Sequence, residues 1–139
     1  MKTMKLFFSL LLLCAGSLAG RTQTIKVLTY NIYHGEENYN RGHSNLGKIA
    51  AVINKYRPDF VAMQEVDSMT KRTAGFNEGA KKDLVAELAK MTGMYGYFGK
   101  AMDYSEGGYG EGLLSRYPAK PVVHALPTPE GGEGRALIV

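Results

Sequence analysis

The sequence predicts a single α/β domain, in which a mixed β-sheet carries helices on one face. Strand-like and helix-like segments alternate through the first part of the chain, a pattern typical of helices packed on a sheet. Only strand-like segments follow, which indicates antiparallel strands that extend this sheet. The composition, with 45% hydrophobic and 22% charged residues, is that of an ordinary globular domain.

Residues 1–20 have the pattern of a secretory signal peptide and are set apart from the fold. Two lysines precede an uncharged apolar run at 6–13, and small residues surround Ala19, as at a signal peptidase site. The run is too short for a helix that crosses about 30 Å of hydrocarbon. A lipid anchor on Cys14 is disfavoured, because leucines rather than small residues precede it. We expect cleavage near Ala19, an extracytoplasmic (periplasmic or secreted) location and no stable membrane anchor.

The predicted mature chain, residues 21–139, carries little net charge and no cysteine. Removal of residues 1–20, which contain two lysines and no acid, lowers the formal net charge from +4 to +2. This excess is too small to indicate a nucleic-acid partner, which usually requires a clustered basic face. Because Cys14 is the only cysteine, the mature chain has no disulfide, thiolate metal site or cysteine nucleophile.

The first strand and the first helix flank a polar stretch at 34–43. Residues 24–32 are rich in β-branched residues and alternate in polarity, which predicts a strand. Ser44 is a candidate N-cap, and apolar residues then recur at helical spacing as far as Tyr56, ahead of Pro58. This spacing predicts a helix with one buried face.

A second strand and a second helix follow. Residues 60–64 are a short apolar run between turn signals, which predicts a buried strand. Residues 68–80 are polar and are predicted to form a loop. Apolar side chains share one face of segment 83–90, and Gly93 provides a helix C-cap.

The remaining segments predict strands and turns. An aromatic-rich strand is expected at 95–101, followed by a flexible Gly-rich loop at 103–109. The other strand-like segments are 112–115, 121–125 and 135–139. The chain ends inside the last of them on Leu-Ile-Val, whereas domains usually end in a polar tail. We therefore expect sequence to be missing; a natural short protein is the alternative.

Two predicted strands end on side chains that can bind ions, Asn31 and Glu65. Ligands bind beyond the carboxyl ends of strands in open α/β sheets, so neighbouring strands would place the two side chains together. Mg²⁺ prefers oxygen ligands and needs only one or two carboxylates from the protein. From spacing alone, Glu65 is equally well interpreted as a metal ligand or as a carboxylate that caps a nearby amide.

Three segments resemble successive motifs of the endonuclease/exonuclease/phosphatase superfamily. They are KVLTYNIYHG at 26–35, PDFVAMQEVD at 58–67 and YGEGLLSRYP at 109–118, and EGRA at 133–136 resembles a fourth. They follow the family's order and cover essentially the whole predicted mature chain. The intervening Arg72-Thr73 and Phe98-Gly-Lys-Ala101 fit the secreted bacterial branch of this family.

The resemblance implies a four-layer α/β sandwich, of which residues 21–139 would be the N-terminal half, and hydrolysis of phosphate esters with Mg²⁺ or Mn²⁺. It makes Glu65 and Asn31 the catalytic and metal-binding residues. The metal would act as a Lewis acid, and water would be the nucleophile. The family's later motifs (His-x-Asp, Gly-Asp-x-Asn and a terminal Asp-His pair) are absent from the sequence, so we expect the chain as given to be inactive.

Three more residues are candidates for substrate binding. His34 could reach phosphate or metal, although an exposed loop histidine is the favoured alternative. Arg72 could bind a substrate phosphate through two hydrogen bonds, or be a solvated loop charge. Tyr109 belongs, with Tyr104, to the Gly-rich segment, which would form a substrate-selecting lid or simply a long hairpin loop.

A secreted location and weak basicity favour a small phosphoester or a lipid headgroup as the substrate. Nucleic acid, and hence a nuclease, is the alternative. A short, non-catalytic binding protein of the same fold is the alternative function. Half of a sandwich would expose an apolar sheet face and a new strand edge, so we also expect the truncated form to self-associate.

Overall fold

A computed structural model describes residues 23–139 of the chain, and the predicted signal peptide at 1–20 lies outside this part. The elements are, in chain order, β1 (Val27–Asn31), the 3-10 helix η2 (Tyr33–Gly35), α2 (Leu46–Tyr56), β2 (Phe60–Ser68), α3 (Lys71–Gly75), α4 (Leu84–Thr92), β3 (Tyr95–Tyr104), β4 (Gly107–Ser115), β5 (Val123–Leu126) and β6 (Arg135–Ile138).

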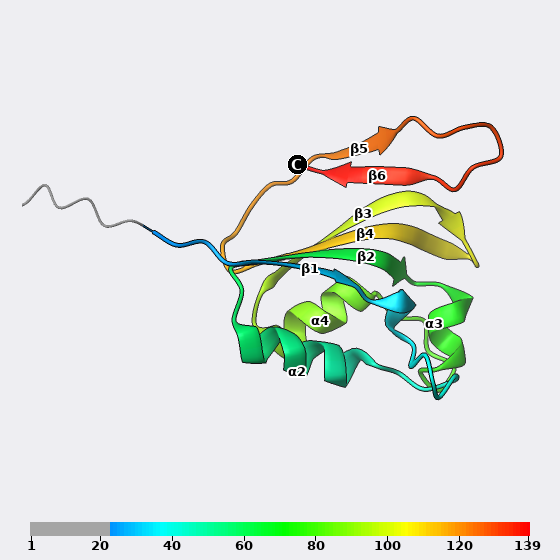
Figure 1. Ribbon diagram of the computed structural model, residues 1–139. Helices are drawn as coiled ribbons and strands as arrows, with labels where there is room; N and C mark the ends of the chain where they lie inside the picture. Colours follow the sequence, from blue (N-terminus) through cyan, green and yellow to red (C-terminus); the bar gives the residue numbers. More distant parts are fainter. Residues whose placement is uncertain (1–22) are drawn as a thin grey trace, which may run out of the picture.

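A four-stranded mixed sheet in the order β1-β2-β4-β3 forms the centre of the fold. Helices α2 and α4 cover one face, and the β5–β6 hairpin lies over β3 and β4 on the other (Figure 1). The predicted α/β fold, with a mixed sheet and helices on one face, is confirmed. Within the described residues, no helix is both long and apolar enough to cross a membrane.

The pairing of β1 with β2 positions the edge of the sheet that matters below. The two strands are parallel, with Asn31 opposite Gln64, and α2 forms the crossover between them. Strand β4 is antiparallel to both β2 and β3. Because parallel strands end at the same edge, β1 and β2 bring the residues that follow them together.

Helix α2 forms because its apolar residues recur on one face, and Ile49 and Ile53 are each 1% exposed. It ends at Arg57, which adopts the left-handed conformation with φ of 49°, and a proline follows. The predicted cap Ser44 is one residue too early, because Asn45 holds the N-cap position. Ser44 instead accepts a long hydrogen bond, 3.5 Å, from the backbone N–H of Leu46.

Two capping side chains begin the next helices. Thr70 accepts a hydrogen bond from the backbone N–H of Thr73 at 3.0 Å, and this cap starts α3 inside the segment predicted to be a loop. Asp83 accepts one from the N–H of Ala86 at 2.9 Å and starts α4. Gly93 ends α4 in the left-handed conformation, as predicted.

The hydrophobic core lies between the sheet and helices α2 and α4. Burial of each large aliphatic side chain contributes about 1.5–3 kcal/mol, so this layer holds β1, β2 and β4 in register. Its fully enclosed members are Ile32, Leu46, Ile49, Ala50, Ile53, Val61, Met63, Val66, Leu84, Val85, Leu88 and Leu114.

The β3–β4 connection is a tight turn, so the predicted flexible loop at 103–109 is wrong. Ser105 and Glu106 have φ of 48° and 61°, the positive values that two-residue hairpin turns favour. Glu106 forms ion pairs with Lys71 and, at 3.3 Å, with Lys81. These exposed pairs link the tip to the segment around α3, and the strands are paired up to the turn, so residues 103–109 form a tight hairpin rather than a long loop.

Candidate functional site

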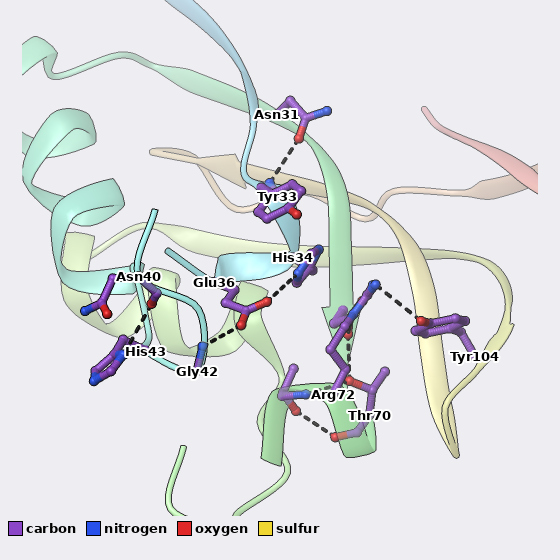
Figure 2. A network of polar contacts seen from close by, with 12 residues as sticks. Asn31, Tyr33, His34, Glu36, Asn40, Gly42, His43, Thr70, Arg72 and Tyr104 are labelled. Carbon is purple, nitrogen blue, oxygen red and sulfur yellow. Dashed lines mark hydrogen bonds and ion pairs between the residues drawn. The ribbon is translucent and has the colours of Figure 1, made fainter. Parts of the chain in front are cut away.

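Asn31 and Glu65 meet at the carboxyl ends of β1 and β2. Asn31 Nδ2 donates a hydrogen bond to Glu65 Oε1 at 2.7 Å. Asn31 Oδ1 accepts one from the backbone N–H of Tyr33 at 3.0 Å, which orients the amide (Figure 2). The two side chains therefore lie together as the topology predicted, and their catalytic and metal-binding roles stay predictions.

A bulge in β2 gives Glu65 its position. Side chains of a regular strand alternate between faces, which would direct Glu65 into the core beside Met63. The pairing with β4 instead shifts register between Met63 and Val66, and Glu65 takes φ of 56°. Met63 and Val66 both stay buried, while Gln64 and Glu65 both line a cavity. Left-handed backbone at a non-glycine residue costs about 1–3 kcal/mol and is common at functional sites.

The Glu65 cavity has a volume of about 300 Å³. It lies at the edge of the sheet and takes residues from β1, β2, β3, β4, the start of β6 and the segment before it, so all four sequence motifs contribute to it. Its lining residues are Asn31, Gln64, Glu65, Ala101, Tyr109, Gly110, Glu111, Glu133, Gly134 and Arg135.

The electrostatic potential in this cavity is negative, because three carboxyl groups, Glu65, Glu111 and Glu133, outnumber the one cation, Arg135, among the described residues that line it. Burial raises the pKa of Glu111; the charge of Arg135 opposes this increase, and the carboxylates of Glu133 and Glu65 add to it. Burial, and then the charges of Glu133 and Glu65, raise the pKa of Tyr109 to about 12. Tyr109 is consequently a neutral hydrogen-bond donor at physiological pH, and a cation would relieve the repulsion among the carboxylates.

These residues fit a magnesium-type ion held by few protein ligands. Within residues 23–139, no group of three or more His, Cys, Asp and Glu side chains is arranged to hold a metal. Mg²⁺ usually keeps several waters and takes one or two carboxylates plus substrate phosphate. Glu65 would supply such a carboxylate, which the hydrogen bond from Asn31 orients. Glu111 and Glu133, which the sequence analysis did not identify as lining this cavity, could have been found from their place inside the third and fourth motifs.

Arg72 lies beside the Glu65 cavity, held by a partner the sequence analysis did not identify. Its Nε and Nη2 donate to Oδ2 and Oδ1 of Asp67 at 2.9 and 2.6 Å, and Asp67 is fully buried. Burial alone would lower the pKa of Arg72, but the hydrogen bonds and charge of Asp67 raise it overall. The solvated-charge alternative is therefore wrong. Asp67 occupies the Nε/Nη2 edge of the guanidinium, so a two-bond phosphate contact, which stays a prediction, would have to use Nη1 and the second N–H of Nη2.

His34 is a buried residue of the η2 turn, so the favoured alternative of an exposed loop histidine is wrong. It is 8% exposed, and its Nε2 lies 3.0 Å from Glu36 Oε2 (Figure 2). Glu36 Oε1 accepts a hydrogen bond from the N–H of Gly42 at 2.6 Å. These contacts close the loop between β1 and α2, and His34 is not among the residues that line the Glu65 cavity. A substrate contact for His34 stays a prediction without geometric support.

The Glu36 contacts predict a pH-dependent stability. The hydrogen bond from Gly42 lowers the pKa of Glu36; burial opposes this, and His34 lowers it further. A lowered folded-state pKa stabilises the fold above the unfolded pKa, about 4.3, and this contribution disappears as the pH falls through the folded value. Glu36→Gln should therefore reduce the free energy of unfolding at pH 7 more than at pH 3.

Chemical unfolding of the two proteins at both pH values measures this effect. Glu37→Gln is the matched control, because Glu37 forms a surface ion pair with Lys48 of the kind that contributes little. A Glu36→Gln deficit that is the same at pH 3 and pH 7 would contradict the assignment.

The fold and the site define an α/β protein with an acidic, metal-compatible cavity at the carboxyl edge of its sheet. Residues 28–138 match the model of the Endonuclease/Exonuclease/phosphatase family. This range includes every strand pair of the sheet and all the residues of the Glu65 cavity. The chain therefore belongs to the Endonuclease/Exonuclease/phosphatase family, as its motifs predicted.

Solved structures share the fold at low sequence identity. A structure described as an endonuclease/exonuclease/phosphatase from Beutenbergia cavernae DSM 12333 is 24% identical and has a TM-score of 0.59. The match covers 82% of this chain and 33% of the Beutenbergia chain. A family protein from Leptotrichia buccalis C-1013-b is 15% identical with a TM-score of 0.59, over 83% of this chain and 47% of its own.

A third similar structure is described as a functionally unknown conserved protein from Enterococcus faecalis V583. It is 16% identical with a TM-score of 0.55, over 81% of this chain and 44% of its own. No curated protein matches the chain. The chain thus spans between a third and a half of the length of these structures, and they show its fold.

Proposed function

We propose that this chain contributes the metal-binding part of a phosphoester hydrolase, in which Glu65 binds Mg²⁺ or Mn²⁺ and Asn31 orients it. The hydrogen bond of 2.7 Å between Asn31 and Glu65, at the mouth of an acidic cavity, is the observation that carries this proposal. Family membership supports the hydrolase class, and the three carboxylates that line the cavity, Glu65, Glu111 and Glu133, support a cation there.

The residues of the Glu65 cavity would have different roles in binding the metal and the phosphate. The amide of Asn31 engages Oε1 of Glu65, so Oε2 can face a cation. The hydroxyl of Tyr109, neutral at physiological pH, can donate a hydrogen bond to a phosphoryl oxygen. When bound, the metal would stabilise charge on the phosphoryl and leaving oxygens.

We further propose a small phosphoester or a lipid headgroup as the substrate, because the formal net charge of the predicted mature chain is only about +2. A nuclease is the alternative; it would bind DNA with an affinity that falls steeply with salt. The extracytoplasmic location, the inactivity of the chain as given and its self-association also stay proposals, as does the alternative of a non-catalytic binding protein.

Metal binding by the chain itself tests the proposal. We expect residues 21–139 to bind Mn²⁺, seen as loss of the free Mn²⁺ signal in electron paramagnetic resonance, and Mg²⁺ to compete. Asn31→Ala should weaken binding about tenfold, within the range found when a residue that orients a metal ligand is removed. Glu65→Gln, which removes the ligand, should weaken it by more than about 100-fold, beyond that range.

Glu87→Gln is the matched control, since Glu87 is a helix carboxylate paired with Lys90 at 3.2 Å outside the cavity. Equal Mn²⁺ affinity in wild type and Glu65→Gln would overturn the proposal. The second readout is hydrolysis of bis(4-nitrophenyl) phosphate by the native protein, whose intact mass shows whether it is longer than the 15.2 kDa of this chain. Hydrolysis that survives Glu65→Ala would equally contradict it.

A further inference from the structure

A second, smaller cavity adjoins the Glu65 cavity. It has a volume of about 110 Å³ and is lined by Arg72, Met102, Tyr104, Tyr109 and Glu133. Tyr109 and Glu133 also line the Glu65 cavity, so the two spaces share a wall. A molecule whose phosphate lies at Glu65 could therefore extend its next chemical group into this space, which we term the Arg72 cavity.

The Arg72 side chain is held rigidly in the wall of this cavity. Asp67 accepts hydrogen bonds from its Nε and Nη2, and the hydroxyl of Thr70 donates to Asp67 Oδ2 at 2.7 Å. This leaves one N–H of Nη2 and both of Nη1, and Nη1 makes a long contact of 3.4 Å to the hydroxyl of Tyr104 (Figure 2). Nη1 can thus donate to a ligand without breaking the bonds to Asp67.

Two aromatic rings form the adjoining wall. Tyr104 and Tyr109 lie on β3 and β4 with ring centroids 5.9 Å apart and tilted by 53°. The Arg72 guanidinium stacks over both, at 4.4 Å from the Tyr104 centroid and 5.5 Å from that of Tyr109. Both tyrosines occupy paired positions of the β3–β4 hairpin, opposite Gly107 and Met102, so strand pairing holds the rings in place.

The charges around the cavity select among ligand classes. The carboxylate of Glu133, whose Oε2 lies 3.8 Å from Nη2 of Arg135 in a loose ion pair, would repel a second anionic group, such as another phosphate. The Arg72 guanidinium, already stacked on both rings, would repel a cationic group such as a quaternary ammonium. A neutral group with hydroxyls avoids both repulsions. It can accept a hydrogen bond from Arg72 Nη1 and donate one to the Glu133 carboxylate. Such charge-assisted hydrogen bonds are stronger than those between neutral groups.

We propose that the Arg72 cavity binds a neutral, polyhydroxylated group, a polyol or sugar, that is esterified to the phosphate at Glu65. The placement of the phosphate rests on the proposed function, whereas the lining, the fixed Arg72 and the Glu133 carboxylate do not. The cavity would make this protein selective for polyol phosphoesters over choline and alkyl phosphoesters.

The methyl group of Met102 gives a direct readout of the cavity. In [¹³C-methyl]methionine-labelled protein with Mg²⁺, glycerol 1-phosphate should shift the Met102 resonance, assigned with Met102→Leu, in a saturable way. Propyl phosphate, which lacks the hydroxyls, should reach half-saturation at an about tenfold higher concentration, equivalent to about 1.4 kcal/mol of binding free energy. Phosphocholine should bind no better than propyl phosphate.

Variants in the same loop show whether Glu133 supplies the selectivity. Glu133→Gln should bring the half-saturation values for glycerol 1-phosphate and propyl phosphate within about twofold, because a charged acceptor becomes a weaker neutral one. Glu130→Gln, in the same connection but outside both cavities, should keep the tenfold preference. Tyr104→Phe, which retains the ring and removes the hydroxyl, provides a second variant if Glu133→Gln perturbs the fold.

The outcomes separate this inference from the proposed function. Equal half-saturation values in wild type, tighter binding of phosphocholine, or no shift at Met102 would overturn the polyol subsite, even where Mn²⁺ binding depends on Glu65. Conversely, selective shifts at Met102 together with Mn²⁺ binding that ignores Glu65 would support the subsite and reject the metal assignment.

Discussion

Asp67→Ala is expected to lower the free energy of unfolding by about 3 kcal/mol, near the lower end of the range for breaking a buried ion pair. Asp67 is fully buried and accepts hydrogen bonds from two nitrogens of Arg72 and from Thr70. The variant leaves Arg72 without its counter-charge and Thr70 without its acceptor. The Arg72 side chain is 26% exposed, so water can compensate part of the loss.

Urea unfolding of wild type and variant measures this effect, and Asp103→Ala is the matched control. Asp103 also forms an ion pair, with Lys100, but its side chain is 89% exposed, and we expect a change of no more than about 0.5 kcal/mol. The double variant Asp67→Leu with Arg72→Met should be more stable than Asp67→Ala, because no buried charge is left alone. A loss below about 1 kcal/mol in Asp67→Ala would show that the pair is not structural.

The effect of Asp67→Ala also bears on the site, because Arg72 forms part of the wall of the Arg72 cavity. Asp67 closes the second sequence motif, two residues after Glu65, and Thr70 both caps α3 and donates to Asp67. The motif therefore contains the metal-binding candidate and the anchor of the neighbouring subsite on one strand. Loss of Asp67 should disturb ligand selectivity as well as stability.

That Asn31 and Glu65 lie at the same edge of the sheet could be predicted from the sequence, because this much depends on topology. A strand, a helix and a second strand predict a parallel pair with a shared carboxyl edge, and the last residues of the strands then meet there. Local signals identified the buried faces of α2 and α4 and the stop at Gly93, while the cap of α2 was placed one residue too early. Family membership followed from motifs that match segments of this edge.

The bulge at Glu65 could not be predicted, because a period of two residues would have placed that side chain in the core. The predicted second strand stopped at Gln64, whereas β2 continues to Ser68. The register shift between Met63 and Val66 allows the strand to continue with its apolar residues still inside. The pairing partner β4, far along the chain, sets this register, and local pattern does not contain it.

Side-chain partners that no helix or strand pattern identifies explain the other errors. Arg72 looked like a loop charge because its counter-ion, Asp67, had no distinguishing local pattern. His34 looked exposed because the stretch at 34–43 is polar, yet Glu36 and Gly42 fold that stretch over it. The segment at 103–109 looked flexible because of its glycines, which instead let strands approach closely.

Gly110→Ala is the second large effect expected, a loss of about 3 kcal/mol and a fall in Tm of roughly 10 °C. A Cβ at Gly110 would lie 2.1 Å from the carbonyl oxygen of Gly99 and 2.7 Å from the backbone nitrogen of Ala101. Both atoms belong to β3, where the pairing shifts register between Lys100 and Met102. Backbone atoms cannot turn aside as a side chain can, so the two strands must separate.

Gly47→Ala is the control that separates this steric effect from the general loss of a glycine. Nothing lies within 4 Å of a Cβ at Gly47, in the exposed part of α2, so alanine should stabilise the protein by about 0.5–1 kcal/mol. Differential scanning calorimetry should show a lower Tm for Gly110→Ala and a higher Tm for Gly47→Ala than for wild type. Because Gly110 opposes Val66 of β2 and lines the Glu65 cavity, its substitution should also weaken Mn²⁺ binding. A Gly110→Ala protein with unchanged Tm would mean that β3 and β4 are not packed this closely. The wall that the two cavities share would then not have the structure described above.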